Sequence, residues 1–210
     1  MTTAEALPNI RERSRLETRR RLIEAGTKLF ARRGFARTRA TDISREAGVA
    51  TGTLYVHFAD KEDLLREILF QGFEEIHAVI RQIAETKYST VGDSVHAHSE
   101  ALVGFAAEHP ALFQILFSTE VATTAAGSEL LSSLTTHQEE RLREGMAEDY
   151  FRADLDPGVA AHAVIGMLTQ VLRWWTQDPS RAPREVVVDT ITKMRLFGLH
   201  TEDSAGGKSA

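Results

Sequence analysis

The chain has 210 residues and a net charge of −5, with 42% hydrophobic residues and no cysteine. This length suffices for one large domain, or for a small domain joined to a medium one. The absence of cysteine excludes a disulfide framework, a thiol nucleophile and a cysteine metal cage. The sequence shows no apolar run near the ~18 residues of a membrane span and no signal-peptide core, which favours a cytoplasmic protein.

Charge is unevenly distributed along the chain. Residues 1–70 carry 14 basic and 10 acidic side chains, whereas residues 71–210 carry 11 basic and 20 acidic ones. The basic excess is concentrated in residues 11–45, which hold 12 basic and 4 acidic side chains. A basic N-terminal third on an acidic body indicates that only the first part meets a polyanion. On charge alone, a solvated helix surface explains the pattern equally well.

Hydrophobic residues recur at helical spacing throughout, and alternating runs of strand type are missing, which predicts an all-α protein with about nine helices. Residues 1–14 are expected to form a flexible basic arm. Its Arg11, Arg13 and Arg15 either enter a minor groove or belong to a disordered tail that keeps the chain soluble. The first helix is predicted over 17–33.

Two short helices separated by a turn are predicted within residues 41–58. Thr41 is expected to cap the first of them, with Asp42 in its first turn. Gly48 is expected to end it with a positive φ, and the second helix covers about 51–57. This is a helix-turn-helix pattern. The outward residues of the second helix are mostly small or hydroxyl-bearing, so its backbone can enter a major groove about 12 Å wide while basic neighbours attract the phosphates.

A long helix then follows, capped by Asp60 and extending to about residue 85. Further helices are predicted over 92–108, 110–118, 127–149, 157–177 and 183–198. The stretch 118–128 is expected to be a loop. In domain terms, the pattern predicts a helix-turn-helix domain over 15–66, a second helical domain over 67–200 and a disordered tail over 201–210.

The run TDISREAGVATGTLYVHFADKEDLL, residues 41–65, resembles the signature of tetracycline-repressor-type (TetR family) transcriptional regulators. The resemblance covers about residues 17–66. It implies a three-helix DNA-binding domain, joined by a long helix to a helical domain that binds an effector and forms a homodimer. The sequence departs from the family at Val56, where many members carry an aromatic residue, and at Asp149, where many carry glycine.

The resemblance also implies roles for individual residues. Thr41, Tyr55, His57 and Lys61 would contact phosphates, and Thr51, Gly52, Thr53 and Tyr55 would face bases. The full set of predicted DNA contacts is Arg39, Thr41, Thr51, Gly52, Thr53, Tyr55, Val56, His57 and Lys61.

The helices 157–177 and 183–198 carry apolar residues on more than one side, which predicts a four-helix bundle between two protomers; a purely internal core is the alternative. Aromatic and aliphatic residues of the second domain suggest an apolar effector, although each fits a plain core residue as well. His137 and Arg141 are candidate polar groups of such a pocket. The predicted ligand contacts are Leu102, Phe105, Phe113, Phe117, Leu134, His137, Met167 and Trp174.

No enzyme, cofactor or metal site is predicted. The sequence contains no HExxH, GxSxG, GxGxxG or phosphate-loop motif, and His96 and His98 are two residues apart, so on a helix they point in different directions. The predicted function is that of a ligand-responsive, sequence-specific DNA-binding regulator. It is expected to be a repressor that binds a palindromic operator as a dimer and is released by a small apolar effector. The alternative is a helical lipid- or small-molecule-binding protein whose N-terminal module contacts other proteins.

Overall fold

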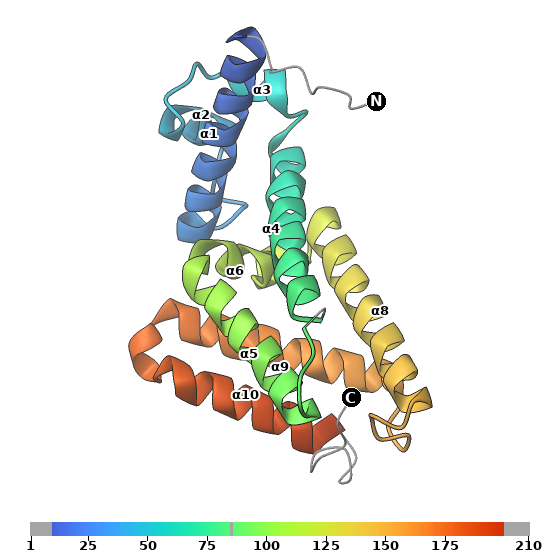
Figure 1. Ribbon diagram of the computed structural model, residues 1–210. Helices are drawn as coiled ribbons and strands as arrows, with labels where there is room; N and C mark the ends of the chain where they lie inside the picture. Colours follow the sequence, from blue (N-terminus) through green and yellow to red (C-terminus); the bar gives the residue numbers. More distant parts are fainter. Residues whose placement is uncertain (1–9, 85, 200–210) are drawn as a thin grey trace, which may run out of the picture. The chain divides into compact units, whose positions relative to one another are not determined.

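The computed structural model describes residues 10–84 and 86–199, and these form ten α-helices, one short 3-10 helix and no strand (Figure 1). The all-α prediction is therefore confirmed. The predictions for residues 1–9 and for the tail 201–210 lie outside the described residues. The chain divides into two compact units, the first ending at Ile68 and the second beginning at Leu69.

The first unit holds α1 (Ile10–Arg33), α2 (Ala40–Glu46), α3 (Thr53–His57) and the start of α4 (Lys61–Ala84). Its core is built from fully buried aliphatic side chains contributed by each of these four helices. They are Leu22, Leu29, Ile43, Leu54, Leu64 and Leu65.

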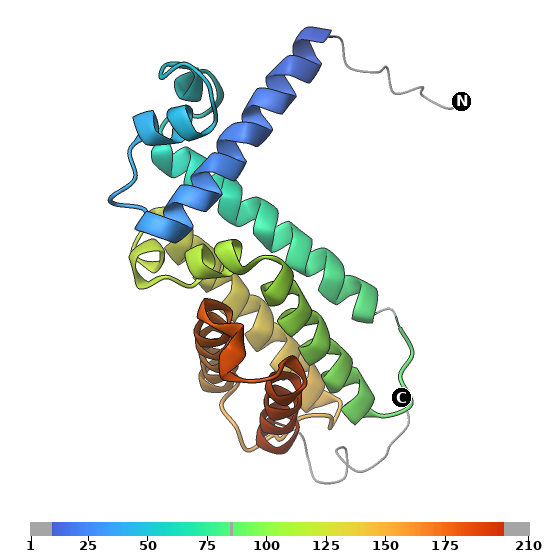
Figure 2. The ribbon, with the colours of Figure 1, turned by 90° about the vertical axis from the view of Figure 1, so that its left-hand side faces the viewer.

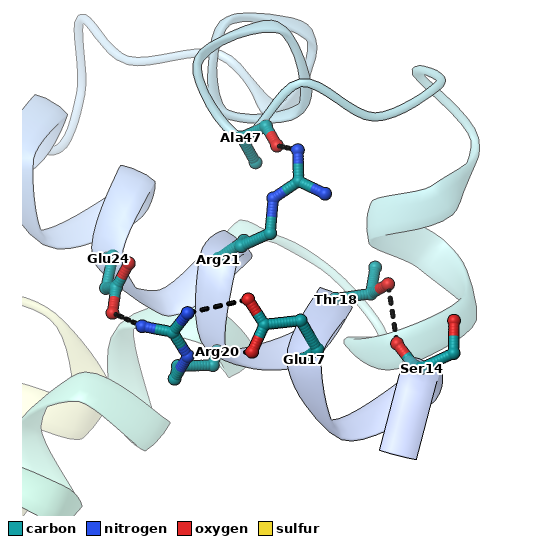
Figure 3. Close-up of polar contacts among 7 residues, drawn as sticks. All are labelled: Ser14, Glu17, Thr18, Arg20, Arg21, Glu24 and Ala47. Carbon is teal, nitrogen blue, oxygen red and sulfur yellow. Dashed lines mark hydrogen bonds and ion pairs between the residues drawn. The ribbon is translucent and has the colours of Figure 1, made fainter. Parts of the chain in front are cut away.

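The helix α1 begins earlier than predicted. Arg11, Arg13 and Arg15 lie on this helix and not on an irregular arm, so the predicted boundary at residue 14 is wrong for the described part. Apolar spacing gave no sign of these turns because their side chains are exposed. Further along α1, Arg20 forms ion pairs with Glu17 and Glu24, and pairs at this spacing stabilise a solvated helix (Figure 3).

The helix α2 also begins before its predicted cap. Arg39, and not Thr41, is the N-cap residue, and Thr41 is the second helical residue with an exposed side chain. The carboxylate of Asp42 accepts a hydrogen bond of 3.3 Å from the backbone N–H of Arg39. The backbone N–H of Arg39 thus has an acceptor at the start of the helix although no serine or threonine caps it.

The second unit contains the rest of α4, α5 (Val91–Glu108), α6 (Pro110–Leu116), α7 (Thr119–Ala122), α8 (Ala125–Ala147), α9 (Pro157–Gln177), η1 (Pro179–Arg181) and α10 (Arg184–Leu199). The predicted long helices are confirmed with small shifts at their ends. Within this unit, α8 packs against α9, and α5 packs against α10. In Figure 2 the orange and red helices α9 and α10 are seen nearly end-on while α5 and α8 run across the view, so the helices of each pair cross.

The predicted loop 118–128 is wrong, because it contains α7 and the first turn of α8. The hydroxyl-rich sequence supplies caps here. Ser118 Oγ accepts a 3.1 Å bond from Val121 N–H, and Thr124 Oγ1 accepts a 3.1 Å bond from Gly127 N–H. Serine and threonine favour both loops and N-caps, so composition alone did not separate the two outcomes.

Candidate DNA interface and ligand cavity

The turn between α2 and α3 is held by glycine geometry and by one arginine of α1. Gly48 has φ 65°, as predicted. The guanidinium of Arg21 donates to the carbonyl of Ala47 (Figure 3) and, at 3.2 Å, to the carbonyl of Gly48. On the other side of the turn, Ser44 Oγ donates a 3.2 Å bond to the carbonyl of Thr51. These contacts fix the start of α3 relative to α1 and α2.

The helix α3 has one buried residue and an exposed face. Leu54 is fully buried, whereas Tyr55 is 58% exposed and Val56 is 67% exposed. Thr51 and Gly52 are exposed as well, and no heavy atom lies within 4 Å of a Cβ built on Gly52. The face thus presents hydroxyl groups, a methyl-bearing side chain and bare backbone, which suits close approach to base edges.

Cationic and titratable groups surround this face. Arg39 and Thr41 are exposed at the start of α2. Lys61 Nζ lies 4.2 Å from the centroid of the Phe35 ring and donates a 2.8 Å bond to the Phe35 carbonyl, so it holds the loop before α2. Burial lowers the pKa of His57, and the charges of Arg15 and Arg19 lower it further. A neutral imidazole at this position keeps one N–H donor for an anion.

The second unit encloses an apolar cavity of about 150 Å³, here called the inner cavity. Helices α4, α5, α6, α8, α9 and α10 all contribute to its wall. The lining residues are Ile76, His77, Arg81, His98, Leu102, Phe113, Phe117, Leu134, His137, Gln138, Arg141, Ile165, Leu168, Thr169, Leu172 and Arg195. The rings of His77 and His137 lie 5.6 Å apart between centroids, and burial followed by the charge of His137 lowers the pKa of His77.

A second cavity of about 510 Å³, the outer cavity, shares four polar residues with the inner one: His98, Gln138, Arg141 and Arg195. Its other residues come from the start of α5 and the segment before it, and from the end of α8 and the turn after it. They include Lys87, Tyr88, Tyr150 and Phe151. The two cavities therefore meet at a polar junction.

Comparison with known proteins matches both units. Residues 22–68 match the family model of bacterial regulatory proteins of the tetR family, and residues 89–199 match the model of the tetracyclin repressor-like C-terminal domain. The chain belongs to the TetR family. It is a DNA-binding transcriptional regulator, as predicted from the helix-turn-helix run.

Individual relatives agree with this assignment. The HTH-type transcriptional repressor KstR2 of Rhodococcus jostii (strain RHA1) is 30% identical over 189 residues, which covers 85% of this chain and 87% of the relative. The solved structure of the ketosteroid transcriptional regulator KstR2 of Mycobacterium tuberculosis is 25% identical, with a TM-score of 0.67, and covers 88% of this chain and 95% of that one. The regulator FadR of Bacillus subtilis, solved in complex with stearoyl-CoA, is 19% identical, with a TM-score of 0.70, and covers 86% of this chain and 99% of that one.

The predicted site residues of this TetR-family regulator fall into groups. Among the DNA-contact candidates, Thr51, Gly52, Thr53, Tyr55, Val56 and His57 lie on α3 or in the turn before it, Arg39 and Thr41 lie at the start of α2, and Lys61 begins α4. Thr53, His57 and Lys61 are half-buried, and the others are exposed. Among the ligand candidates, Leu102, Phe113, Phe117, Leu134 and His137 line the inner cavity.

Three ligand candidates lie elsewhere. Phe105 is buried against His109 and Phe113. Trp174 is 43% exposed, with the guanidinium of Arg181 over its ring. Met167 lines a surface groove between α9 and α10. Helical spacing placed them on apolar faces, but only the packing decides which apolar face meets a cavity.

Apart from Arg141 and His137, the basic groups of the cavities were not predicted from the sequence. They are His77, Arg81, His98 and Arg195 in the inner wall, and Lys87 in the outer one. For Arg195 a signal was present, since Met194, Leu196 and Phe197 flank it. Over the described part of the chain, no helix is both long and apolar enough to span a membrane, and no group of three or more His, Cys, Asp or Glu residues is placed to hold a metal.

Proposed function

We propose that this regulator binds a palindromic operator as a homodimer and represses transcription until a small apolar effector enters the inner cavity. The observation that supports DNA reading is the exposed, uncharged face of α3, which has Arg15 and Arg19 of α1 close to its His57 end. On this proposal Thr51, Gly52, Thr53, Tyr55 and Val56 face bases. Arg39, Thr41, His57 and Lys61 contact phosphates and position the helix.

The proposed dimer interface is formed by α9 and α10. Val159 and Trp174 of α9, and Val186, Met194 and Phe197 of α10, are exposed large apolar side chains. A groove of about 470 Å³ lies between these helices and is lined mainly by apolar residues, Met167 and Met194 among them. A second copy of the chain would remove this surface from water and bring two copies of α3 to one duplex. Half-sites one turn apart require a separation of about 34–36 Å.

The proposed effector site is the inner cavity. Small-molecule sites are commonly concave and apolar with a few polar groups, and this cavity has that composition. The related structure that contains stearoyl-CoA supports an acyl-bearing or similarly apolar ligand at the level of the shared fold. In the proposed dimer, an effector that binds more tightly to one arrangement of the two protomers' α4 helices would change the separation of their α3 helices. The dimer would then no longer fit both half-sites and would release the DNA.

The deciding experiment is fluorescence anisotropy of the full chain on DNA from its own upstream region. We expect two protomers per site, and an affinity that falls about 10³–10⁵-fold between about 50 and 200 mM salt if ~6–10 phosphates are contacted. Tyr55→Ala and Thr51→Ala should each weaken specific binding by about ten- to a hundredfold while the fold is kept. Thr136→Ala, at an exposed threonine of α8 in the second unit, is the matched control.

Sequence-blind binding by the wild type to every upstream and genomic fragment would contradict the operator proposal. Unchanged operator affinity in the Tyr55→Ala and Thr51→Ala variants would contradict the assignment of α3 as the reading helix.

A further inference from the structure

Arg195 is a half-buried arginine with one buried, unpaired donor at the junction of the two cavities. Its Nε is buried and has no hydrogen-bond partner, and its Nη1 makes a 3.3 Å bond to Ser99 Oγ. Burial, followed by the charge of Arg141, lowers the pKa of Arg195 to about 10. The guanidinium is therefore charged at neutral pH. Buried charges are normally paired, because removing them from water is costly.

The two cavities that share Arg195 are lined by several bases and no acid. Asp154 and Asp156 lie with Arg195 only in the separate surface groove between α9 and α10. Arg141 and His98 line both cavities with Arg195, Arg81 lines the inner one and Lys87 the outer one. Among the described residues that line the two cavities, none is Asp or Glu. This is notable in a chain with 30 acidic and 25 basic residues. The junction is thus a site of concentrated positive charge inside an acidic protein.

His98 adds a second unpaired group. The side chain is only 8% exposed, and its Nδ1 lies 2.7 Å from the carbonyl of Ser94. Because a carbonyl only accepts, Nδ1 carries a proton, and the buried Nε2 has no partner. If the ring becomes protonated beside an anion, Nε2 turns into a second inward donor.

We propose that the effector is an amphiphilic anion, whose apolar body fills the inner cavity and whose oxyanion is bound at the junction by Arg195 with Arg141 and His98. This inference rests on the proposed effector site and specifies the chemical class of its ligand. The inner cavity has about the volume of an engineered apolar cavity that holds benzene. Its occupant is accordingly an aromatic ring or an acyl chain of about six carbons.

The oxyanion can come from two sources with the same charge. One is a carboxylate on the apolar body itself. The other is a phosphate of a carrier thioester, whose polar part would extend into the outer cavity towards Lys87. In both cases an arginine-rich, acid-free junction favours the charged ligand over a neutral analogue of the same shape.

Calorimetry on the full chain without DNA tests the proposal with matched ligands. The first pair is hexanoate against hexanamide, and the second is hexanoyl-phosphopantetheine against hexanoyl-pantetheine, which lacks only the phosphate; phenylacetate against phenylacetamide repeats the first pair with a ring. We expect the charged member of at least one pair to bind about ten- to a hundredfold more tightly. The pair that shows the preference identifies the source of the oxyanion.

Substitutions of Arg195 test whether this residue causes the preference for the charged ligand. Arg195→Met should remove the preference for the charged ligand, and Arg195→Lys should restore part of it. Removing a cation whose buried donor is unpaired should leave the melting temperature unchanged or raised, so loss of binding will not reflect unfolding. Arg143→Met is the control on α8, because Arg143 is exposed and paired with Glu139 at 2.5 Å.

Equal affinities within all three pairs, or a charge preference that survives Arg195→Met, would overturn the anion proposal. So would binding of the neutral ligands only. Operator release, measured separately by anisotropy, distinguishes this failure from a failure of the proposed function. If neutral ligands bind the chain and make it release the operator, only the anion proposal is refuted. If the chain binds none of the ligands, and none of them changes its operator affinity, the effector site and the anion proposal are both refuted.

Discussion

Arg21 Nη2 lies 2.7 Å from the position that a Cβ would occupy on Gly48. The same guanidinium donates to the carbonyls of the two consecutive residues Ala47 and Gly48. Glycine is therefore required at this turn for two reasons, its φ of 65° and the room that it leaves for the arginine of α1. The turn that sets the direction of α3 depends on a residue far from it in sequence.

Gly48→Ala should lower the free energy of unfolding by about 2 kcal/mol, since the left-handed backbone costs an L-residue about 1–2 kcal/mol and the new methyl displaces Arg21. Urea denaturation measures this. Gly52→Ala is the matched variant, because Gly52 has φ −72° and open space around its Cβ. We expect it to keep stability while weakening operator binding. A stable Gly48→Ala protein would show that the turn tolerates both changes.

Asp149 also has a left-handed backbone, with φ 60°, just after α8. Replacing it with glycine should raise the free energy of unfolding by about 0.5–1 kcal/mol, because relief of the strained backbone exceeds the added entropy of the unfolded chain. Thermal and urea unfolding of Asp149→Gly measure the gain. Ala153→Gly in the exposed segment that follows is the comparison, and it should give no gain. A fall in the free energy of unfolding of Asp149→Gly would mean that the aspartate side chain stabilises the fold by more than its left-handed backbone destabilises it.

His98 should make stability depend on pH. Burial, opposed by the Ser94 hydrogen bond and reinforced by the charges of Arg195 and Arg141, lowers its pKa in the folded chain. The unfolded chain then binds the proton more readily below about pH 6.5, so the free energy of unfolding falls as pH drops through that value and is constant above it. Urea midpoints from pH 8 to 5 should fall less for His98→Gln than for the wild type.

His96→Gln is the control for this pH dependence, because His96 is exposed on the same helix. It should behave like the wild type. Identical pH profiles for His98→Gln and the wild type would contradict the role given to burial.

Phe197 is 72% exposed on α10, which is a costly position for a large apolar ring unless a partner covers it. Phe197→Glu should convert the proposed dimer to a monomer in sedimentation velocity, with operator affinity reduced by at least about tenfold because a monomer reaches one half-site. Ala107→Glu, at an exposed position of α5, should leave the dimer intact. A Phe197→Glu protein that remains dimeric would place the interface elsewhere.

The helical class, the long helices of the second unit and the helix-turn-helix could be predicted from the amino-acid sequence. Each of these depends on local information: apolar spacing along one helix, a proline at the start of α6 and of α9, and glycine where the backbone must be left-handed. The exposed residues of α3 were predictable for the same reason, because a helix of five residues with one buried leucine leaves most of its surface outside the core.

Which residues meet at the junction of the cavities depends on how the helices pack in three dimensions. Arg195 of α10, Arg141 of α8 and His98 of α5 are far apart in sequence. Helical spacing predicts the side of its helix on which each residue lies, but not which other helix packs against that side. The same limit applied to Phe105, Met167 and Trp174, whose apolar character suits a cavity wall, a core or an interface equally. Packing assigns the role because the distance between helices, and not the pattern along one of them, determines where a void remains and which charges are enclosed beside it.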